Sequence, residues 1–306
     1  IVGTHALITD AVRFKDLAVA VIDEQHRFGV HQRLALRSKG ADGQTTPHII
    51  VMTATPIPRT MAMTVFGDLD LSTIDQLPPG RKKIITRVVN TDKEAEVYAY
   101  VRKRLDEGEQ AYIVAPAIES EEGLFDEHNV INATKPVTIA EVVAKLETGP
   151  LAGKRLAMMH GRMDRDEREA IMQSFRAGRI DALVATTVIE VGVDVPNATV
   201  MVIEDAERFG LATLHQLRGR VGRGSKGGLC VLISRAWSEQ SVAAGERLAV
   251  MAQSADGFVI AQRDIEIRGF GDVIGVRQSG IPPFKVADLT RDLDLLTLAR
   301  RDAESW

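Results

Sequence analysis

A glutamine and two arginines within residues 214–224, LHQLRGRVGRG, have the spacing of side chains that act together. If the stretch is helical, Gln216, Arg220 and Arg223 lie on one face, because residues three and four apart are neighbours on a helix. Two guanidinium groups on one face suit a planar, multiply charged anion, and a triphosphate is the natural candidate. The alternative is a solvated basic face on a surface helix.

Carboxylates and hydroxyls follow two apolar runs near the start of the chain. The run 18–22 leads directly into Asp23 and Glu24, and ligands of open α/β sheets bind beyond the carboxyl ends of the strands. Asp23 can hold Mg²⁺, and Glu24 can orient or deprotonate an attacking water. The alternative is that both are turn residues or charges at a helix N-terminus. Thr53 and Thr55 place two hydroxyls at the end of the second run.

The stretch TTVIEVGVDVP, residues 186–196, carries another group of candidate binding residues. Thr186 and Thr187 follow a predicted strand and can donate to a phosphodiester. Gly192 permits close approach of the backbone to a ligand. Asp194 can either accept a hydrogen bond from a ribose hydroxyl or hold an arginine side chain in position.

The composition indicates a globular protein of about two domains. The 306 residues are 26% charged and 45% hydrophobic, which is ordinary for a soluble protein. The formal net charge of −4 gives no global basic footprint, so any surface that binds nucleic acid must be local. Cys230 is the single cysteine and lies in an apolar run, which excludes structural disulfides and fits a reducing cytosol. No apolar run reaches the length of about 18 residues that a membrane span needs.

The pattern of apolar runs predicts an α/β fold with parallel sheets. We expect buried strands at 17–22, 49–52, 111–115, 156–159, 182–185, 199–203 and 229–233. A Gly/Pro-rich linker is expected near residue 80. From residue 237 the pattern becomes helical, and helices over 238–253 and 258–267 with a turn at 254–257 form a predicted αα-hairpin.

Four of these stretches, in this order and spacing, resemble the motif series of superfamily 2 helicases. They are DEQH at 23–26, TATP at 53–56, TTVIEVGVDVP at 186–196 and QLRGRVGRG at 216–224. The segments DEQHRFGV at 23–30, RDIEIRG at 263–269 and RQSG at 277–280 are most similar to the bacterial DNA branch-migration helicases within that superfamily. The transcription-repair coupling translocases are the alternative.

The resemblance implies tandem RecA-like parallel-sheet domains, the first one incomplete, followed by a helical-hairpin translocation tail. The expected bounds are 1–82, 83–236 and 237–306. The implied cofactors are ATP and Mg²⁺. By this resemblance Asp23 organises the metal ion and Glu24 positions water, while Gln216, Arg220 and Arg223 reach the γ-phosphate; Gly192 and Asp194 complete the nucleotide side.

The resemblance also implies a DNA-facing side and a coupling apparatus. The expected DNA contacts are Gly3, Thr4, Thr53, Thr55, Thr186 and Thr187. His26 is expected to couple the nucleotide and DNA sides, and Arg247, Arg268 and Gln278 are expected to serve translocation. The implied partners are branched DNA, as forks and Holliday junctions, and single-stranded DNA-binding protein. A monomer in the bacterial cytoplasm, associated with the nucleoid and with no membrane contact, is expected.

The family's phosphate loop, Gly-x-x-x-x-Gly-Lys-Ser/Thr, does not occur in these 306 residues. The segment GPLAGKR at 149–155 has one residue too few between its glycines, ends in Arg and has no predicted strand before it. We therefore expect the loop and a DNA-binding wedge to lie upstream, and the chain alone to be inactive. The alternative is a non-catalytic interaction module. Residues 119–136 are expected to be an insertion.

Overall fold

The computed structural model describes residues 1–9, 11–23, 36, 39, 46–53, 70, 72–74, 76, 82–117, 136–187, 194–235, 242–268 and 292–304. The chain divides into two compact units, residues 1–56 with 271–288 and residues 57–270 with 289–306. The domain bounds expected from the sequence stay predictions, and the expected insertion lies, apart from Pro136, outside the described residues. None of the described helices has the length and apolar character needed to span a membrane.

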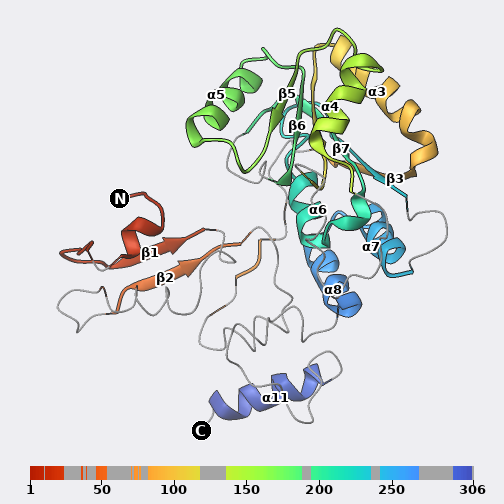
Figure 1. Cartoon of the computed structure of the whole chain (residues 1–306). Helices are drawn as coiled ribbons and strands as arrows, with labels where there is room; N and C mark the ends of the chain where they lie inside the picture. The colour runs from red at the N-terminus through yellow and green to blue at the C-terminus, as the bar shows by residue number, and fades with distance from the viewer. Residues whose placement is uncertain are drawn as a thin grey trace. The chain divides into compact units, whose positions relative to one another are not determined.

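The first unit contains a 3-10 helix, η1 (His5–Ile8), and two parallel strands, β1 (Val19–Ile22) and β2 (His48–Val51) (Figure 1). Both strands were expected from apolar runs, and both are confirmed with small shifts of their ends. The amide of Met52 donates to the carbonyl of Ile22 at 2.7 Å, which carries the pairing to the last residue before Asp23 and Thr53. These two predicted site residues therefore follow the carboxyl ends of neighbouring strands.

The second unit is built on a six-stranded sheet in which every pair of neighbours is parallel. The strand order is β3-β8-β7-β4-β6-β5, so the chain crosses the sheet repeatedly and needs a helix or loop for each crossover. The strands are β3 (Ile85–Asn90), β4 (Gln110–Val114), β5 (Leu156–Met159), β6 (Ala182–Ala185), β7 (Ala198–Ile203) and β8 (Leu229–Ser234).

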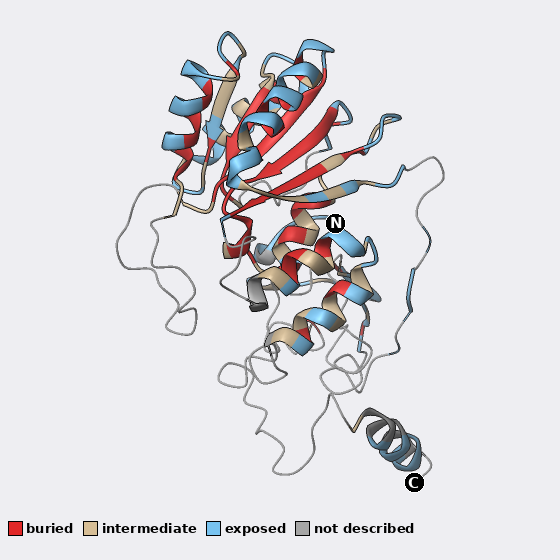
Figure 2. Ribbon diagram, turned by 90° about the vertical axis from the view of Figure 1, so that its right-hand side faces the viewer, coloured by how far each residue is buried: buried red, intermediate tan, exposed pale blue. Residues whose placement is uncertain are grey.

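Helices cover both faces of this sheet, as the predicted α/β class requires (Figures 1 and 2). Buried residues of α3 and α4 pack on one face, and those of α5, α6, α7 and α8 pack on the other. The described helices that pack on the sheet are α3 (Glu94–Asp106), α4 (Ile139–Thr148), α5 (Arg165–Arg176), α6 (Leu211–Arg218), α7 (Val242–Gln253) and α8 (Gly257–Arg268). A further helix, α11 (Leu293–Glu304), lies near the end of the sequence.

Alternate residues of the central strands serve the two cores. In β4, Ala111 and Ile113 join the core under α3 and α4, whereas Tyr112 and Val114 join the core under the other helices. Cys230 of β8 is free and fully buried in that second core, and burial raises the pKa of its thiol to about 12. The apolar run that holds Cys230 in the sequence is accordingly a strand of the core.

The five strands predicted for the second unit are confirmed, but β3 was missed. Its sequence, ITRVVN, is short, and its residues are only partly buried because β3 lies at the edge of the sheet. An arginine inside the run and an asparagine at its end hide the apolar signal that marks the central strands. The strand at the opposite edge, β5, was predicted because its residues, LAMM, form a continuous apolar run.

The prediction that residues 214–224 form one helix is wrong. Helix α6 ends at Arg218, Gly219 follows as its C-cap, and Gly222 adopts a left-handed backbone with φ of 67°. Because that conformation is unavailable within a right-handed helix, Arg220 and Arg223 lie in the segment after the helix and not on its face. Only Gln216 of the predicted group is helical.

The predicted αα-hairpin is confirmed in helices α7 and α8, which pack against each other and against α6. The turn between them is Ser254–Asp256. The side chain of Asp256 accepts from the amide of Phe258 at 2.8 Å, the arrangement of an N-cap at the start of α8. The amide of Ser254 donates to the carbonyl of Val250 and closes the last turn of α7.

Candidate functional site

The residues after α6 form a fixed loop, which we call the arginine loop and define as residues 219–228. Its first part is anchored by apolar side chains, because Leu214 and Leu217 of α6 and Val221 of the loop are fully buried in the core. They hold the start of the loop against the sheet although the helix ends earlier than predicted.

Glycines fix the middle of the arginine loop. The amide of Gly222 donates to the carbonyl of Ala198 at 3.2 Å, at the first residue of β7. A Cβ atom on Gly222 would lie 2.9 Å from the backbone nitrogen of Gly228, and one on Gly224 would lie 2.5 Å from the carbonyl oxygen of Pro196. Larger residues therefore cannot occupy either position without moving backbone. The loop lies against the segment that enters β7.

A buried carboxylate holds the end of the arginine loop. Lys226 Nζ lies 2.9 Å from an oxygen of Glu109, whose exposed fraction is only 3%. Arg104 contacts the same carboxylate at 2.6 Å, and the hydroxyl of Thr199 donates to it. Burial alone would raise the pKa of Glu109, but the bonds from Thr199 and Lys226 and the nearby Arg104 lower it below its usual range. The carboxylate therefore stays ionised and keeps its hold on Lys226.

Three predicted nucleotide-side residues lie near one another at this loop. Arg223 donates from Nε to the carbonyl of Gly219 at 3.0 Å, and the same nitrogen lies 3.9 Å from Asp194. Burial raises the pKa of Tyr112 to about 12, although the charges of Arg220 and Arg223 both act to lower it. The charges of both arginines therefore act on the same buried phenol. Gln216, in contrast, is half-buried on α6 before the loop begins.

The two predicted DNA-contacting threonines of the second unit lie at the opposite end of the strands from the arginine loop. Thr186 and Thr187 directly follow β6, at the carboxyl end of the parallel strands. The amide of Thr186 donates to the carbonyl of Met159 at 3.3 Å, so its backbone is fixed to β5. The arginine loop instead contacts Ala198, at the amino end of β7. Within the second unit, Thr186 and Thr187 thus lie at the opposite end of the strands from the arginine loop.

The remaining predicted residues divide between described and undescribed parts of the chain. Gly3 and Thr4 are exposed before η1, and Asp23 is exposed after β1. Arg247 of α7 is buried and donates from Nη2 to the carbonyl of Glu207 at 3.3 Å. The following lie outside the described residues: Glu24, His26, Thr55, Gly192, Gln278 and the side chain of Arg268. The roles of all these residues stay predictions.

The segment GPLAGKR begins at Gly149, which is the C-cap of α4. A phosphate loop follows a strand and opens a helix, whereas this segment follows a helix and leads to a strand. Arg102 donates to the carbonyls of Pro150 and Ala152, which ties the segment to α3. The prediction that it is not a phosphate loop is confirmed.

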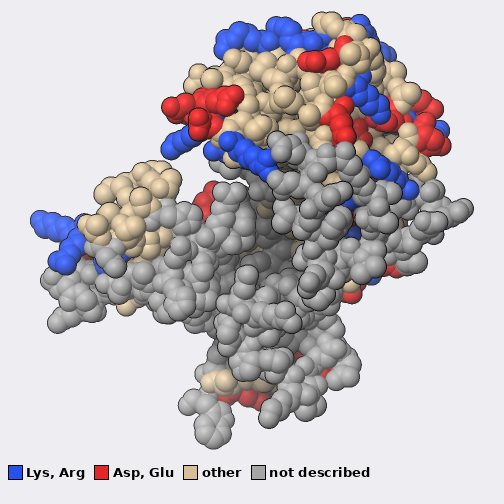
Figure 3. Space-filling model, in the orientation of Figure 1, with Lys and Arg blue, Asp and Glu red and all other residues tan. Residues whose placement is uncertain are grey.

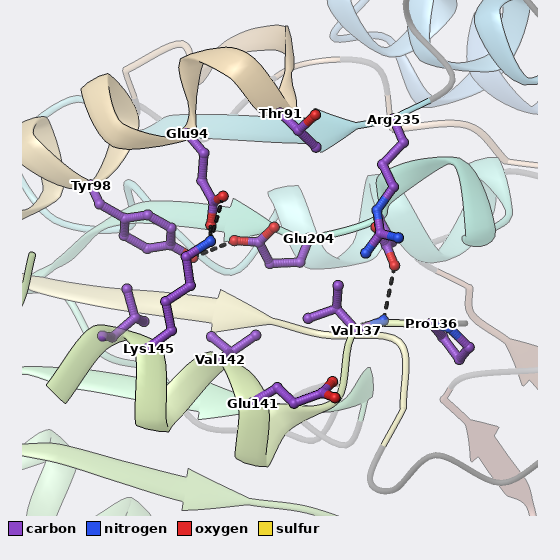
Figure 4. Close-up of a pocket in the computed structure, with 12 residues that line it drawn as sticks. Thr91, Glu94, Tyr98, Pro136, Val137, Glu141, Val142, Lys145, Glu204 and Arg235 are labelled. Atoms are coloured by element: carbon purple, nitrogen blue, oxygen red, sulfur yellow. Dashed lines mark hydrogen bonds and ion pairs between the residues drawn. The ribbon is translucent and has the colours of Figure 1, made fainter. Parts of the chain in front are cut away.

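Sequence reasoning did not identify a pocket at the carboxyl ends of the strands, between α3 and α4 (Figure 4). Its volume is about 470 Å³. Tyr98 donates to the carboxylate of Glu204, an acid that is only 5% exposed. Lys145 pairs with Glu94 at 2.5 Å across the mouth. Burial raises the pKa of Glu204 to about 7, against the bond from Tyr98 that lowers it. Most carboxylate oxygens of this pocket are thus used within the protein.

Replacing Glu204 with glutamine is expected to stabilise the chain at pH 8 but not at pH 4.5. The folded-state pKa of Glu204 is raised, so its protonated form is favoured and stability is lost as pH rises from the ordinary value of 4.5 through about 7. An amide does not ionise and still accepts from Tyr98. Chemical denaturation should show a gain of up to about 3 kcal/mol at pH 8.

Glu147→Gln, on the exposed side of α4, is the control for this pH series, and its stability should follow that of the unchanged chain. An equal effect of Glu204→Gln at both pH values would contradict the assignment.

Charges of both signs are mixed over the described surface of the second unit that is in view in Figure 3. The figure shows no single large basic face there, in agreement with the net charge of −4. Any phosphate contact on this face must therefore depend on a few placed residues and not on a broad positive charge.

Comparison with known proteins defines the class first. Residues 92–225 match the family "Helicase conserved C-terminal domain", which covers most of the second sheet unit and ends within the arginine loop. A helicase from Mycobacterium smegmatis, Lhr bound to ssDNA and AMP-PNP, shares this fold with a TM-score of 0.55 at 18% identity over 82% of this chain and 33% of that one. The chain thus contains a RecA-like helicase C-terminal domain.

The family follows from closer relatives. Residues 254–306 match "ATP-dependent DNA helicase RecG, domain 3, C-terminal". The chain is 51% identical over 297 residues to the ATP-dependent DNA helicase RecG of Pasteurella multocida and 48% identical over 304 residues to that of Bacillus subtilis. These alignments cover 97% and 99% of this chain but 41% and 42% of the relatives. The chain belongs to the RecG family and spans less than half the length of these curated relatives.

A solved structure supports the same assignment. The structure of RecG bound to a three-way DNA junction matches with a TM-score of 0.70 at 45% identity. The match covers 96% of this chain and 35% of that one. The family match of the tail favours RecG over the transcription-repair coupling translocases, which the sequence had left as the alternative.

Proposed function

We propose that this chain carries the last part of the first RecA-like domain, the second RecA-like domain and the translocation tail of an ATP-driven double-stranded DNA translocase that remodels forks and Holliday junctions by branch migration. The observation that carries the proposal is the arginine loop, which carries Arg220 and Arg223 on a backbone fixed by tightly packed glycines, by a bond to the sheet and by the ion pair of Lys226 with a buried carboxylate. Support comes from relatives that are ATP-dependent DNA helicases and from a RecG structure that contains a three-way junction.

Arg220 and Arg223 are proposed to approach the γ-phosphate of ATP from the second RecA-like domain, with Gln216 beside them. A guanidinium offers a rigid fork of donors and keeps its charge, which suits a phosphoryl group that gains charge in the transition state. Asp194, at 3.9 Å from Arg223, is proposed to orient that arginine. Gly192 is proposed to let the backbone approach the nucleotide.

The first unit is proposed to supply the metal and water positions. Asp23 follows a strand and is exposed, and a carboxylate oxygen is a ligand type that Mg²⁺ prefers. Glu24 is proposed to position the attacking water. Bound Mg²⁺ would neutralise charge on the phosphates. The phosphate loop that hydrolysis requires is not among these 306 residues, so the proposed activity is that of the full-length protein that carries this chain.

The DNA-facing residues are proposed to be Gly3, Thr4, Thr53, Thr55, Thr186 and Thr187. Hydroxyls and backbone amides hold phosphates without reading bases, as a translocase that moves over any sequence requires. His26 is proposed to couple the two sides, and Arg247, Arg268 and Gln278 to transmit motion to the DNA. Single-stranded DNA-binding protein is a proposed partner of a monomeric enzyme at the bacterial nucleoid.

The full-length protein is expected to convert a synthetic three-way junction into its unwound products when ATP is present. The isolated chain is expected to leave the junction unchanged, because it has no phosphate loop to hold the nucleotide. Native gel electrophoresis of labelled junctions measures the conversion. Conversion of the junction by the isolated chain would contradict the proposal that this activity needs the phosphate loop of the full-length protein.

A further inference from the structure

Arg218 is an unusual residue for the place it occupies. It is the last residue of α6, its exposed fraction is 3%, and Leu214 and Leu217 of the same helix belong to the apolar core. Burial lowers the pKa of its guanidinium, yet arginine keeps its charge in proteins. A charge in such a position persists only where other groups compensate it.

The compensation comes from the end of α7 and the hairpin turn. Arg218 Nη1 donates to the carbonyls of Met251 at 3.0 Å and Ser254 at 2.7 Å, and Nη2 donates to the carbonyl of Ala255 at 3.3 Å. These carbonyls belong to the last turn of α7 and the residues just beyond it, where a helix has unsatisfied acceptors and the negative end of its dipole. One side chain therefore caps another helix and holds its turn.

His215 completes the arrangement on α6 itself. Its Nδ1 lies 2.9 Å from Nη2 of Arg218, and since arginine only donates, this nitrogen must accept. Burial, helped by the charge of Arg218, lowers the pKa of His215 to about 4. The imidazole is therefore neutral near pH 7 and its tautomer is fixed with the proton on Nε2. Among the described residues, all hydrogen-bond partners of Arg218 are neutral acceptors.

The arginine loop does not depend on these bonds. Its middle is fixed by Gly222 on Ala198 and its end by Lys226 on Glu109. Arg247 offers a second link from α7, but it reaches Glu207 of η6 (Ala206–Arg208). Arg218 stands one residue before the loop and is bonded to the hairpin, so it connects the two directly.

We propose that Arg218 is a positioning residue that makes α6 and the α7–α8 hairpin move as one body. A displacement of the arginine loop on nucleotide binding or hydrolysis then passes through the guanidinium to the end of α7. The inference rests on the proposed function, because it assigns the element that transmits motion and not the one that hydrolyses ATP. Without these bonds the loop still contacts the nucleotide, but the hairpin no longer follows it.

The test uses Arg218→Gln and Arg218→Lys in the full-length protein. Arg179→Gln is the control, since Arg179 is an exposed arginine that bonds Ser174 away from the hairpin. DNA-stimulated phosphate release gives the ATP turnover, and triplex displacement gives the base pairs moved. Both Arg218 variants should hydrolyse ATP at a rate within about threefold of that of the unchanged protein. They should move roughly tenfold fewer base pairs for each ATP hydrolysed, which is the size of effect expected of mutations that change only the coupling between two sites. Arg218→Lys should not restore the movement per ATP, because one ammonium group cannot reach all of the separate carbonyls that the guanidinium contacts.

Turnover and movement that fall in proportion, or that are both unchanged, would overturn the assignment of Arg218. If the unchanged protein itself shows no ATP-dependent movement, the proposed function fails instead, and the two failures are thereby distinguished. If Arg218→Gln does not fold, the variant Asp256→Ala tests the same proposal. It removes the cap bond to Phe258 and loosens the turn whose carbonyls Arg218 holds. It should lower movement per ATP in the same direction, and an unchanged ratio would overturn the inference.

Discussion

Replacing Arg220 with alanine in the full-length protein is expected to reduce DNA-stimulated ATP hydrolysis by about 10³- to 10⁵-fold, the range found for arginine fingers. The structure gives the reason, because Arg220 follows Gly219 in a loop whose backbone is fixed at Gly222 and at Lys226. A guanidinium carried on a backbone that is already fixed needs little reorganisation of the loop when charge develops on the phosphoryl group. Steady-state phosphate release at saturating DNA measures the loss.

The matched control for Arg220→Ala is Arg179→Ala, which removes an exposed arginine of the same unit and should leave the rate unchanged. Binding of a three-way junction should survive in both variants, because neither arginine is among the proposed DNA contacts and Thr186 and Thr187 lie at the opposite end of the strands from the arginine loop. Hydrolysis by Arg220→Ala within tenfold of the unchanged protein would show that this arginine is not a finger. A loss of junction binding equal to the loss of hydrolysis would point to a folding defect.

Replacing Phe175 with alanine is expected to lower the free energy of unfolding of the chain by about 3–5 kcal/mol, as for other fully buried phenylalanines. Phe175 of α5 has no exposed surface, and its ring centroid lies 5.0 Å from that of Tyr112 at an interplanar angle of 60°. Removal of the ring leaves a cavity between α5 and β4 and loses this aromatic contact. Urea denaturation followed by circular dichroism measures the difference.

Tyr100→Ala is the control for Phe175→Ala, because Tyr100 is an aromatic residue on α3 whose ring is largely exposed. That variant should change the free energy of unfolding by less than about 1 kcal/mol. A similarly small effect of Phe175→Ala would mean that α5 does not depend on the core beneath it.

The sequence alone predicted the central strands because each is a continuous apolar run buried on both faces. The amphipathic tail was predictable for a related reason, since its apolar positions recur with helical spacing. The edge strand β3 lacks such a run. Residues 214–224 were predicted wrongly for a different reason: their apolar and polar positions fit a helix, but the glycines after Arg218 favour a loop. The backbone conformation of Gly222 decides the outcome, and spacing does not reveal it.

The residues that hold the site were harder to foresee than those that act in it. Glu109 lies 117 positions before Lys226, and Arg218 bonds carbonyls 33 to 37 positions later. A buried charge with distant or backbone partners leaves no local pattern, because its meaning depends on which elements the fold brings together. The arginines of the loop were identifiable because their type and close spacing already suit a triphosphate.

The most direct test of the central claim is the conversion of a labelled three-way junction by the full-length protein with ATP, with a non-hydrolysable ATP analogue and without nucleotide. We predict conversion with ATP alone, and binding without conversion in the other two cases. Junctions that are bound but never converted in the presence of ATP would contradict the assignment of this chain to a branch-migration motor.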